Sequence, residues 1–399
     1  MADIILEIHH INVGTGDATL IVVRDTVTIK NLLTVGGVAL PLNNYGILKL
    51  AVDNHITLDG TVLKSVLIDA GNDSGKANKI EAYLTRMGVT ELNYVLTSHY
   101  HQDHLGGYPY LLKKIKNAVN AEAYDRGDGL PAGSSNFTKY RTALAGYTLV
   151  KVPAPILPAT IATSIDLGTG NNGQKMLLKC IAADSAAIDG SKTVSATDQN
   201  DFGLAWYLEY GAFRYLTSGD LGGFNIGNYA DMETPMIEKS TLVNKHICAC
   251  KLNHHGSEHS TNPYYLSIIQ PKVVVISVGD RKYGYDHHPH KEVIEDLERI
   301  DWDVSTWSGK PSPDNKPNPI SRFYVTSLRK NFGDSRDQIG KTPKSKIGGD
   351  TVIIVDDTNI DTRSKYAVYC NGEKPGAGVV KDNNIMRKGT VCIDYYDCH

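Results

Sequence analysis

Three histidines and one aspartate lie within the segment His99-Tyr100-His101-Gln102-Asp103-His104. In an extended segment His99 and His101 point to the same side, and Asp103 and His104 can turn toward a second point close by. Imidazole and carboxylate groups are ligands for Zn²⁺, and also for Mn²⁺ or Fe²⁺. Because two ligand pairs lie side by side, the spacing favours one or two metal ions that activate water for hydrolysis.

The other histidines are unevenly placed as well. Of the 14 histidines, nine fall in the windows 99–104, 254–259 and 287–290. Each window follows a predicted strand, and strand ends are where α/β folds keep their chemistry. Ser257 lies in a turn just before a predicted helix start, so it is a candidate for binding a phosphate oxygen of a substrate. Asp17 follows two glycines and either approaches the metal or serves as a turn residue.

Short apolar segments with polar ends predict the strands that position these residues. The expected strands are 4–13, 18–23, 65–68, 93–96, 204–210, 213–217, 247–252, 272–278, 349–355 and 366–370. Helices are expected around 80–87, over 111–119, after Pro263 and after Pro289, where Val293, Leu297 and Ile300 would share one face. This alternation of strands and helices predicts an α/β fold.

Composition narrows the class of protein. The 399 residues are 41% hydrophobic and 21% charged, with a net charge of −3, which excludes a disordered chain and a globally basic DNA-coating protein. The first residues contain no charged segment followed by an apolar one, and apolar stretches are shorter than the roughly 20 residues of a membrane span. We therefore expect a cytoplasmic protein without a membrane segment.

Further segments accompany the histidine cluster in a fixed order. They are Asn12-Val13-Gly14-Thr15-Gly16-Asp17-Ala18, Leu67-Ile68-Asp69-Ala70-Gly71, Leu105-Gly106-Gly107, Leu216-Thr217-Ser218-Gly219-Asp220-Leu221, His254-His255-Gly256-Ser257 and Tyr283-Gly284 with His288-Pro289. The His-x-His-x-Asp-His pattern resembles the metallo-β-lactamase superfamily. The whole set resembles the hydrolase-like domain of ComEC-type competence proteins, which act in DNA uptake. The resemblance implies a four-layer αββα sandwich with insertions and a C-terminal extension.

The same resemblance implies a domain organisation and a ligand set. Residues 1–300 would form the hydrolase domain, and residues 301–399 a C-terminal extension with a basic segment and closing strands, packed on the same domain. The implied metal ligands are His99, His101, Asp103, His104, Asp220, His254 and His255.

Roles within this set also come from the resemblance. The pair His99 and His101 would hold the first metal, the pair Asp103 and His104 the second, and Asp220 would bridge both. One histidine of the pair at 254–255 would complete the second site, and Asp103 would also orient the nucleophilic hydroxide. Asp69 would order the ligand loop without binding the metal.

One departure from the superfamily pattern concerns the first metal. Most dinuclear members have another histidine before the bridging aspartate, whereas this chain has none between His104 and His246. The first metal could be completed by His288, by Asn200 or Asp201, or be absent. We favour His288, which lies at a helix start like the Gly-His-Pro of ComEC-type domains. Asp103, Asp220 and His288 are thus the predicted catalytic residues.

The predicted function is metal-dependent hydrolysis of a phosphodiester by a metal-bound hydroxide, with one or two Zn²⁺, or Mn²⁺ or Fe²⁺. The expected partner is an anionic substrate such as a nucleic acid or nucleotide. Residues 322–346 contain seven Lys or Arg against two Asp, and this basic segment either guides such a substrate or is a solvated loop. The alternatives are hydrolysis of an amide, lactam or thioester, and a non-catalytic binding module that retains the fold.

Overall fold

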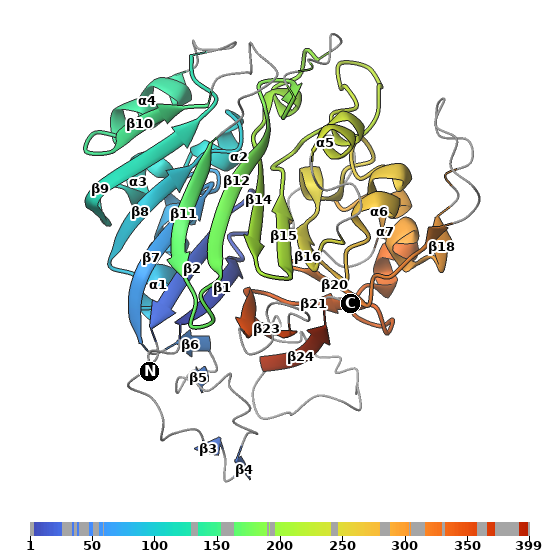
Figure 1. Cartoon of the computed structure of the whole chain (residues 1–399). Coiled ribbons are helices and arrows are strands. Elements are labelled where there is room, and N and C mark those ends of the chain that lie inside the picture. Colours follow the sequence, from blue (N-terminus) through green and yellow to red (C-terminus); the bar gives the residue numbers. More distant parts are fainter. Residues whose placement is uncertain are drawn as a thin grey trace.

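The structure is a computed structural model of the chain. The residues that it describes are 4–25, 34–35, 38–39, 48–50, 56–58, 60–128, 135–152, 163–189, 191, 196–240, 246–279, 288–302, 304, 316–328, 332–356, 365–371 and 391–397. Within these residues two large β-sheets lie face to face, with helices on both outer sides (Figure 1). The segment Tyr283-Gly284, which carried part of the resemblance, lies outside the described residues.

The first sheet has the strand order β10-β9-β8-β7-β2-β1-β22-β23-β24. Its strands are β1 (Ile4–His10), β2 (Thr19–Asp25), β7 (Thr61–Ile68), β8 (Glu91–Leu96), β9 (Lys116–Asp125), β10 (Thr148–Lys151), β22 (Thr351–Asp356), β23 (Lys365–Asn371) and β24 (Val391–Asp397). The strands from β7 to β10 pair in parallel, and the other pairs are antiparallel. The carboxyl ends of β7 and β8 therefore meet at one edge.

The second sheet has the order β11-β12-β14-β15-β16-β17-β20-β21, with β13 paired to β12. Its strands are β11 (Ser164–Thr169), β12 (Lys175–Ala183), β13 (Ala186–Ala187), β14 (Ala205–Tyr210), β15 (Phe213–Thr217), β16 (Ala249–Lys251), β17 (Val273–Ile276), β20 (Arg322–Val325) and β21 (Ser345–Ile347). The strands from β15 to β21 pair in parallel, so β15 and β16 also end at a common edge. Three two-stranded ribbons are formed by β3 (Thr34–Val35) with β4 (Val38–Ala39), β5 (Leu48–Leu50) with β6 (Ile56–Leu58), and β18 (Asp301–Trp302) with β19 (Lys316–Pro317).

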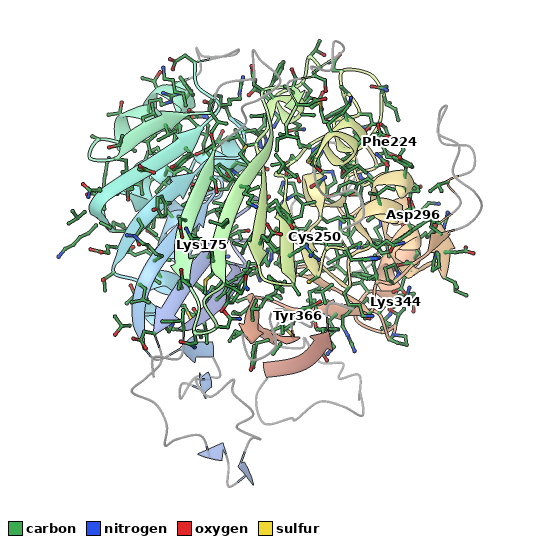
Figure 2. The ribbon with its side chains drawn as sticks, in the orientation of Figure 1. Lys175, Phe224, Cys250, Asp296, Lys344 and Tyr366 are labelled. Carbon is green, nitrogen blue, oxygen red and sulfur yellow. The ribbon has the colours of Figure 1, made fainter. Side chains whose placement is uncertain are left out.

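Alternation along the strands builds three apolar layers. In β1, Leu6 and Ile8 face the second sheet and pack in the same cluster as Leu208 and Tyr215, whereas Ile5 faces outward toward the helices. Side chains fill the space between the layers, as Figure 2 shows around Cys250. Each fully buried Leu or Ile contributes about 2 kcal/mol to the free energy of unfolding, so this repeated alternation fixes the register of the sheets.

Helices cover the outer face of each sheet. The first sheet is covered by α1 (Ser74–Arg86), α3 (Tyr108–Leu111) and α4 (Ser135–Ala143), and the second by α5 (Glu233–Lys239), α6 (Pro263–Ile269) and α7 (Lys291–Glu298). A short helix, α2 (Gln102–Leu105), and the 3₁₀ turns η1 (Asn200–Phe202), η2 (Asn253–Gly256) and η3 (Ser335–Gln338) complete the described elements. The order of layers is helix, sheet, sheet, helix, and the predicted αββα fold class is confirmed.

Two local predictions about helices are wrong. The segment 111–119 is not a helix, because α3 ends at Leu111 and β9 begins at Lys116. Asn120 has a φ of 58° next to a shift in the β8–β9 register, and this bulge hides the two-residue alternation that marks a strand. Helix α7 ends at Glu298, so Ile300 does not share its apolar face and is 90% exposed.

The C-terminal strands contribute to both large sheets. β20 and β21 extend the second sheet beyond β17, and β22 pairs with β1 in the first sheet. The domain boundary at residue 300 stays a prediction. In the part of the chain that the structure describes, no helix is long and apolar enough to cross a membrane. The cytoplasmic location stays a prediction too.

Candidate metal centre

Loops that follow β1, β7, β8, β15 and β16 contact one another at one edge of the two sheets. The Asp17 backbone N–H donates to the Asp103 carbonyl at 3.2 Å, and the Ala70 N–H donates to the His104 carbonyl at 2.7 Å. From the second sheet, the His254 N–H donates to the Gly219 carbonyl at 3.2 Å. These backbone bonds hold the candidate residues from distant parts of the sequence in one place.

The turn between β1 and β2 lies directly against α2. Gly16 has a φ of 98°, and a Cβ atom at this position would lie 2.2 Å from the carbonyl oxygen of Asp103. Only glycine allows this close approach in the left-handed region. The glycines of this turn therefore bring the Asp17 side chain up to the ligand loop.

His104 is fixed from behind by a carboxylate. Its Nδ1–H donates to Asp69 Oδ2 at 2.8 Å, and Asp69 also accepts from the backbone N–H of Ser98 at 2.8 Å and its hydroxyl at 2.6 Å. The His104 Nε2 atom on the other side of the ring lies 3.1 Å from Asp220 Oδ2. Asp69 thus orders the ligand loop, as the resemblance implied, and directs Nε2 toward the centre.

His255 is oriented in the same way from the other sheet. It lies in η2 with a left-handed φ of 54°, and its Nδ1–H donates to the Ser277 carbonyl at 2.7 Å. Its Nε2 atom lies 3.3 Å from Asp220 Oδ2 and 3.5 Å from Asp103 Oδ2. The two imidazoles, one from each half of the chain, therefore present Nε2 to the same carboxylates.

The carboxylates of Asp220 and Asp103 face these two Nε2 atoms. Asp220 Oδ2 lies between both Nε2 atoms, and Asp103 Oδ1 lies 3.9 Å from Nε2 of His104. The side chains of His104, His255 and Asp220 are buried, whereas the Asp103 side chain is 19% exposed. Asp103 is therefore the most solvent-accessible side chain of these four.

Opposite charges dominate the protonation of this group. Burial disfavours the imidazolium of His255, but Asp220 and Asp17 outweigh it and raise its pKa to about 10. The pKa of His104 is likewise raised well above its usual range, against burial, by Asp220 and Asp69. Burial alone would raise the pKa of Asp220, yet His104 and His255 lower it well below its ordinary value. The Asp220 carboxylate is therefore ionised, and the imidazoles of His104 and His255 beside it favour their protonated form.

The donor set fits a metal ion. Asp17, His104, Asp220 and His255 are buried, and each offers a ligand atom within 4.8 Å of the others. Clustered buried carboxylates and imidazoles are costly without a cation, and these groups suit Zn²⁺, Mn²⁺ or Fe²⁺. The chemistry of the donors supports a metal but does not choose among these ions.

His99 and His101 lie beside this centre. His99 is buried, its Nε2 is 3.0 Å from Nδ1 of His101, and its ring centroid is 4.1 Å from that of His104. Burial, with His104 and His101 nearby, lowers the pKa of His99 well below its usual range, so its imidazole is neutral. The assignment of His99 and His101 to the first metal stays a prediction.

His254 and His288 form a separate group at the rim. The His254 ring lies 5.5 Å from the His288 ring, and its Nε2 is 3.4 Å from the Asn200 side-chain nitrogen. The His288 ring is 6.0 Å from that of His255. Burial lowers the pKa of His254 to about 3 and, with His255 nearby, that of His288 to about 2. Both imidazoles are neutral, and their metal and catalytic roles stay predictions.

The remaining candidates have other partners. Asp201 accepts from the Ala230 backbone N–H at 2.8 Å, and burial raises its pKa to about 7. The Ser257 hydroxyl accepts from the His259 N–H at 3.3 Å, and Ser257 is 1% exposed. Substrate binding by Ser257 stays a prediction.

The sequence analysis missed Lys251, which lies at the end of β16. Its Nζ is 2.6 Å from Asp17 Oδ2 and 3.6 Å from Asp220 Oδ1, and its side chain is 2% exposed. A lysine in the otherwise apolar segment 247–252 was the signal, because a buried ammonium group requires a partner.

In the described part of the basic segment 322–346, three cationic side chains lie close to carboxylates. Lys346 and Arg322 lie 2.6 and 3.7 Å from Asp394 Oδ2, and Arg336 lies 2.6 Å from Asp334. Lys344 lies in the lower right part of the molecule in Figure 2, well separated from the position of α2 in Figure 1. These carboxylates neutralise much of the local charge, which weakens the case for a substrate guide here.

A family model and a curated relative match parts of this chain. Residues 61–175 match the model of the metallo-beta-lactamase superfamily. The resemblance predicted from the sequence is confirmed. ComE operon protein 3 of Bacillus subtilis (strain 168) is 24% identical over 219 residues, which span 54% of this chain and 24% of that relative. This chain therefore corresponds to about a quarter of that protein's length.

Two solved structures illustrate the similarity to this chain. The metallo-beta-lactamase fold protein YhfI from Bacillus subtilis is 12% identical, with a TM-score of 0.35, over 67% of this chain and 86% of its own. A long-form RNase Z from yeast is 11% identical, with a TM-score of 0.35, over 72% of this chain and 39% of its own.

Proposed function

We propose that this protein is a metal-dependent hydrolase that cleaves a phosphodiester in an anionic substrate, a nucleic acid or a nucleotide. The observation that carries the proposal is the approach of two Nε2 atoms, from His104 and His255, to one oxygen of Asp220 at 3.1 and 3.3 Å. This arrangement is suited to one or two Zn²⁺, with Mn²⁺ or Fe²⁺ as alternatives. Asp103 and Asp220 are the proposed catalytic residues, with His288 at the rim as a further candidate.

A bound metal of this kind lowers the pKa of water and polarises a phosphoryl oxygen. The side chains of the protein would position the metal and the attacking water. His104 and Asp220 would hold the metal from opposite sheets, so the centre would form only when both sheets are packed. Asp103 is ionised, because His104 and His255 outweigh burial and lower the pKa of its carboxyl. As the exposed member, Asp103 can accept a hydrogen bond from an attacking water and orient it.

Two lysines support an anionic substrate. Lys79 Nζ lies 3.4 Å from the Val13 carbonyl, and a Cβ on Gly14 would lie 3.3 Å from Lys76 Nζ. Both ammonium groups thus border the turn that leads to Asp17 and α2. Phosphate groups on either side of a scissile bond are attracted to such cations. The similarity to ComEC-type proteins points to the same class of substrate.

The test is hydrolysis by purified protein loaded with Zn²⁺ or Mn²⁺. Three substrates separate the bond classes: bis-p-nitrophenyl phosphate, single-stranded DNA and nitrocefin. We expect turnover of the first two, and loss of turnover in Asp220→Ala and His101→Ala. Turnover of nitrocefin alone would assign a carbonyl substrate instead. A protein that stays empty of metal after loading would rule out both hydrolase hypotheses in favour of a binding module.

A further inference from the structure

A buried ammonium group lies behind the metal centre. Lys251 is 2% exposed, and its Nζ donates to the carbonyl oxygens of Gly219 at 2.8 Å and Leu252 at 3.1 Å. The same Nζ lies 2.6 Å from Asp17 Oδ2 and 3.6 Å from Asp220 Oδ1. Lys251 is thus in contact with both carboxylates while the carbonyls fix its position.

Asp17 is the principal counter-ion of this lysine. Both side chains are 2% exposed, and isolated charges at this depth are very unfavourable. The Lys251–Asp17 distance is shorter than any other distance between this lysine and a carboxylate in the described residues. The two groups therefore form a buried ion pair between the β1–β2 turn and β16.

Asp17 lies on the Nδ1 side of both imidazoles, whereas Asp220 and Asp103 lie on the Nε2 side. Its oxygens lie 3.8 Å from Nδ1 of His104 and 3.5 Å from Nδ1 of His255. Those Nδ1 atoms already donate to Asp69 and to the Ser277 carbonyl. The Nε2 atoms, which face Asp220 and Asp103, lie on the far side of both rings.

We propose that Asp17 and Lys251 are a positioning pair and that Asp17 is not a metal ligand, although it lies within 4.8 Å of the ligand atoms. Lys251 approaches Asp220 on Oδ1, which leaves Oδ2 directed at both Nε2 atoms. Asp17 neutralises Lys251 and faces the Nδ1 edges of the rings. The proposal rests on the metal-binding part of the proposed function.

The pair is tested by zinc binding, without any substrate. Equilibrium dialysis and metal analysis would compare Asp17→Asn, Lys251→Met and Lys251→Arg with Asp220→Asn as the ligand control. We expect Asp17→Asn and Lys251→Met to keep the wild-type number of Zn²⁺ per chain with a Kd raised about 10–100-fold, as for other groups behind metal ligands. Asp220→Asn should lose bound Zn²⁺, and Lys251→Arg should recover part of the affinity that Lys251→Met loses.

Two further measurements report on geometry and pairing. The visible spectrum of the Co²⁺-loaded protein should keep its intensity but shift its band maxima in Asp17→Asn and Lys251→Met. The Tm of the metal-free protein should fall in each single variant, and the double variant Asp17→Asn/Lys251→Met should fall by less than the sum of the two. This double-mutant cycle still reports on the coupling of the two residues if a single variant has a low Tm.

Distinct results would overturn the proposal. Fewer Zn²⁺ per chain in Asp17→Asn than in wild type would make Asp17 a ligand. Wild-type Kd and Co²⁺ spectra in both single variants would exclude a positioning role, and additive losses in Tm would exclude a pair. Wild-type protein without Zn²⁺ would instead contradict the proposed function, while the Tm cycle would still decide whether the two residues are coupled.

Discussion

The Nδ1 atom of His104 lies 2.8 Å from Oδ2 of Asp69, which follows β7 with a left-handed φ of 62°. This bond fixes which nitrogen of the ring is left to face Asp220. A carboxylate behind a ligand histidine sets the tautomer and raises the basicity of the ring. The geometry of the centre thus depends on a residue that does not itself face the metal position.

Asp69→Asn is expected to weaken metal binding without changing the number of ions bound. Both oxygens of Asp69 accept hydrogen bonds from Ser98 or His104, whereas an amide has only one accepting oxygen. One of these bonds is therefore lost, and the Kd for Zn²⁺ should rise about 10–100-fold. Asp73→Asn is the matched control, since Asp73 caps α1 by accepting from Gly75 and Lys76, and asparagine caps equally well. Equal Kd values in wild type and Asp69→Asn, measured by competition with a chelator, would contradict the assigned role.

Metal binding is expected to release protons. The pKa of His255 is raised to about 10 and that of His104 is raised as well, so both rings are protonated near pH 7 in the metal-free protein. A proton must leave before Nε2 can ligate, so affinity should rise with pH, by about one decade per pH unit for each proton released between pH 6 and 8. Calorimetry in buffers of different ionisation enthalpy counts these protons. A Kd independent of pH over this range would argue that the rings are neutral before binding.

Gly16→Ala is expected to disturb the centre, because the new methyl group would meet the Asp103 carbonyl oxygen at 2.2 Å. The backbone of α2 must then shift, at a cost of about 3 kcal/mol in the free energy of unfolding. Gly173→Ala provides the control, since Gly173 also has a positive φ of 81° but nothing lies within 4 Å of its added Cβ. That variant should lose only about 1 kcal/mol, from the left-handed backbone alone. Similar denaturant midpoints and Zn²⁺ affinities in the two variants would show that the approach to Asp103 is unimportant.

Lys76→Gln/Lys79→Gln is expected to impair cleavage of single-stranded DNA more than that of bis-p-nitrophenyl phosphate. Two lost phosphate contacts should reduce the slope of log kcat/KM against log salt by about 1.4. Lys175→Gln/Lys179→Gln removes the same charge from the β12 strand, where both lysines are already paired with Asp166 and Glu209. An equal effect of the two double variants on DNA cleavage would show that Lys76 and Lys79 act only through the net charge of the protein and not through contacts with phosphate groups.

Much of the site could be predicted because its residues occupy strand ends that the sequence marks clearly. Apolar segments ending in Asp69, His99, Asp220 and His254 all became strands or their ends, since polar groups at such ends find partners across the edge of the sheets. Which histidine of the pair at 254–255 faces Asp220 could not be predicted. That choice depends on the left-handed turn of η2 and on the Ser277 carbonyl, which is contributed by another strand.

Other errors have the same physical origin. The strand β9 contains three alanines and two asparagines, which have little preference for a sheet, so neighbouring β8 and β10 decide its conformation. The pattern around Lys251 predicts only an apolar strand, because its partner Asp17 lies far away in sequence, in the β1–β2 turn. Long-range pairs of this kind are invisible to patterns within a short window.

The position of β1 has a consequence for how the protein is made. Leu6 pairs with Val23 on one side and with Val355 on the other, so β1 lies in the interior of its sheet and gains its second neighbour only after β22, far later in the chain, has been synthesised. Until then its backbone edge is an open template for pairing with other chains. Recombinant fragments cut near residue 300 would keep that edge exposed, together with the edge of β17, and we expect them to aggregate where the full chain does not.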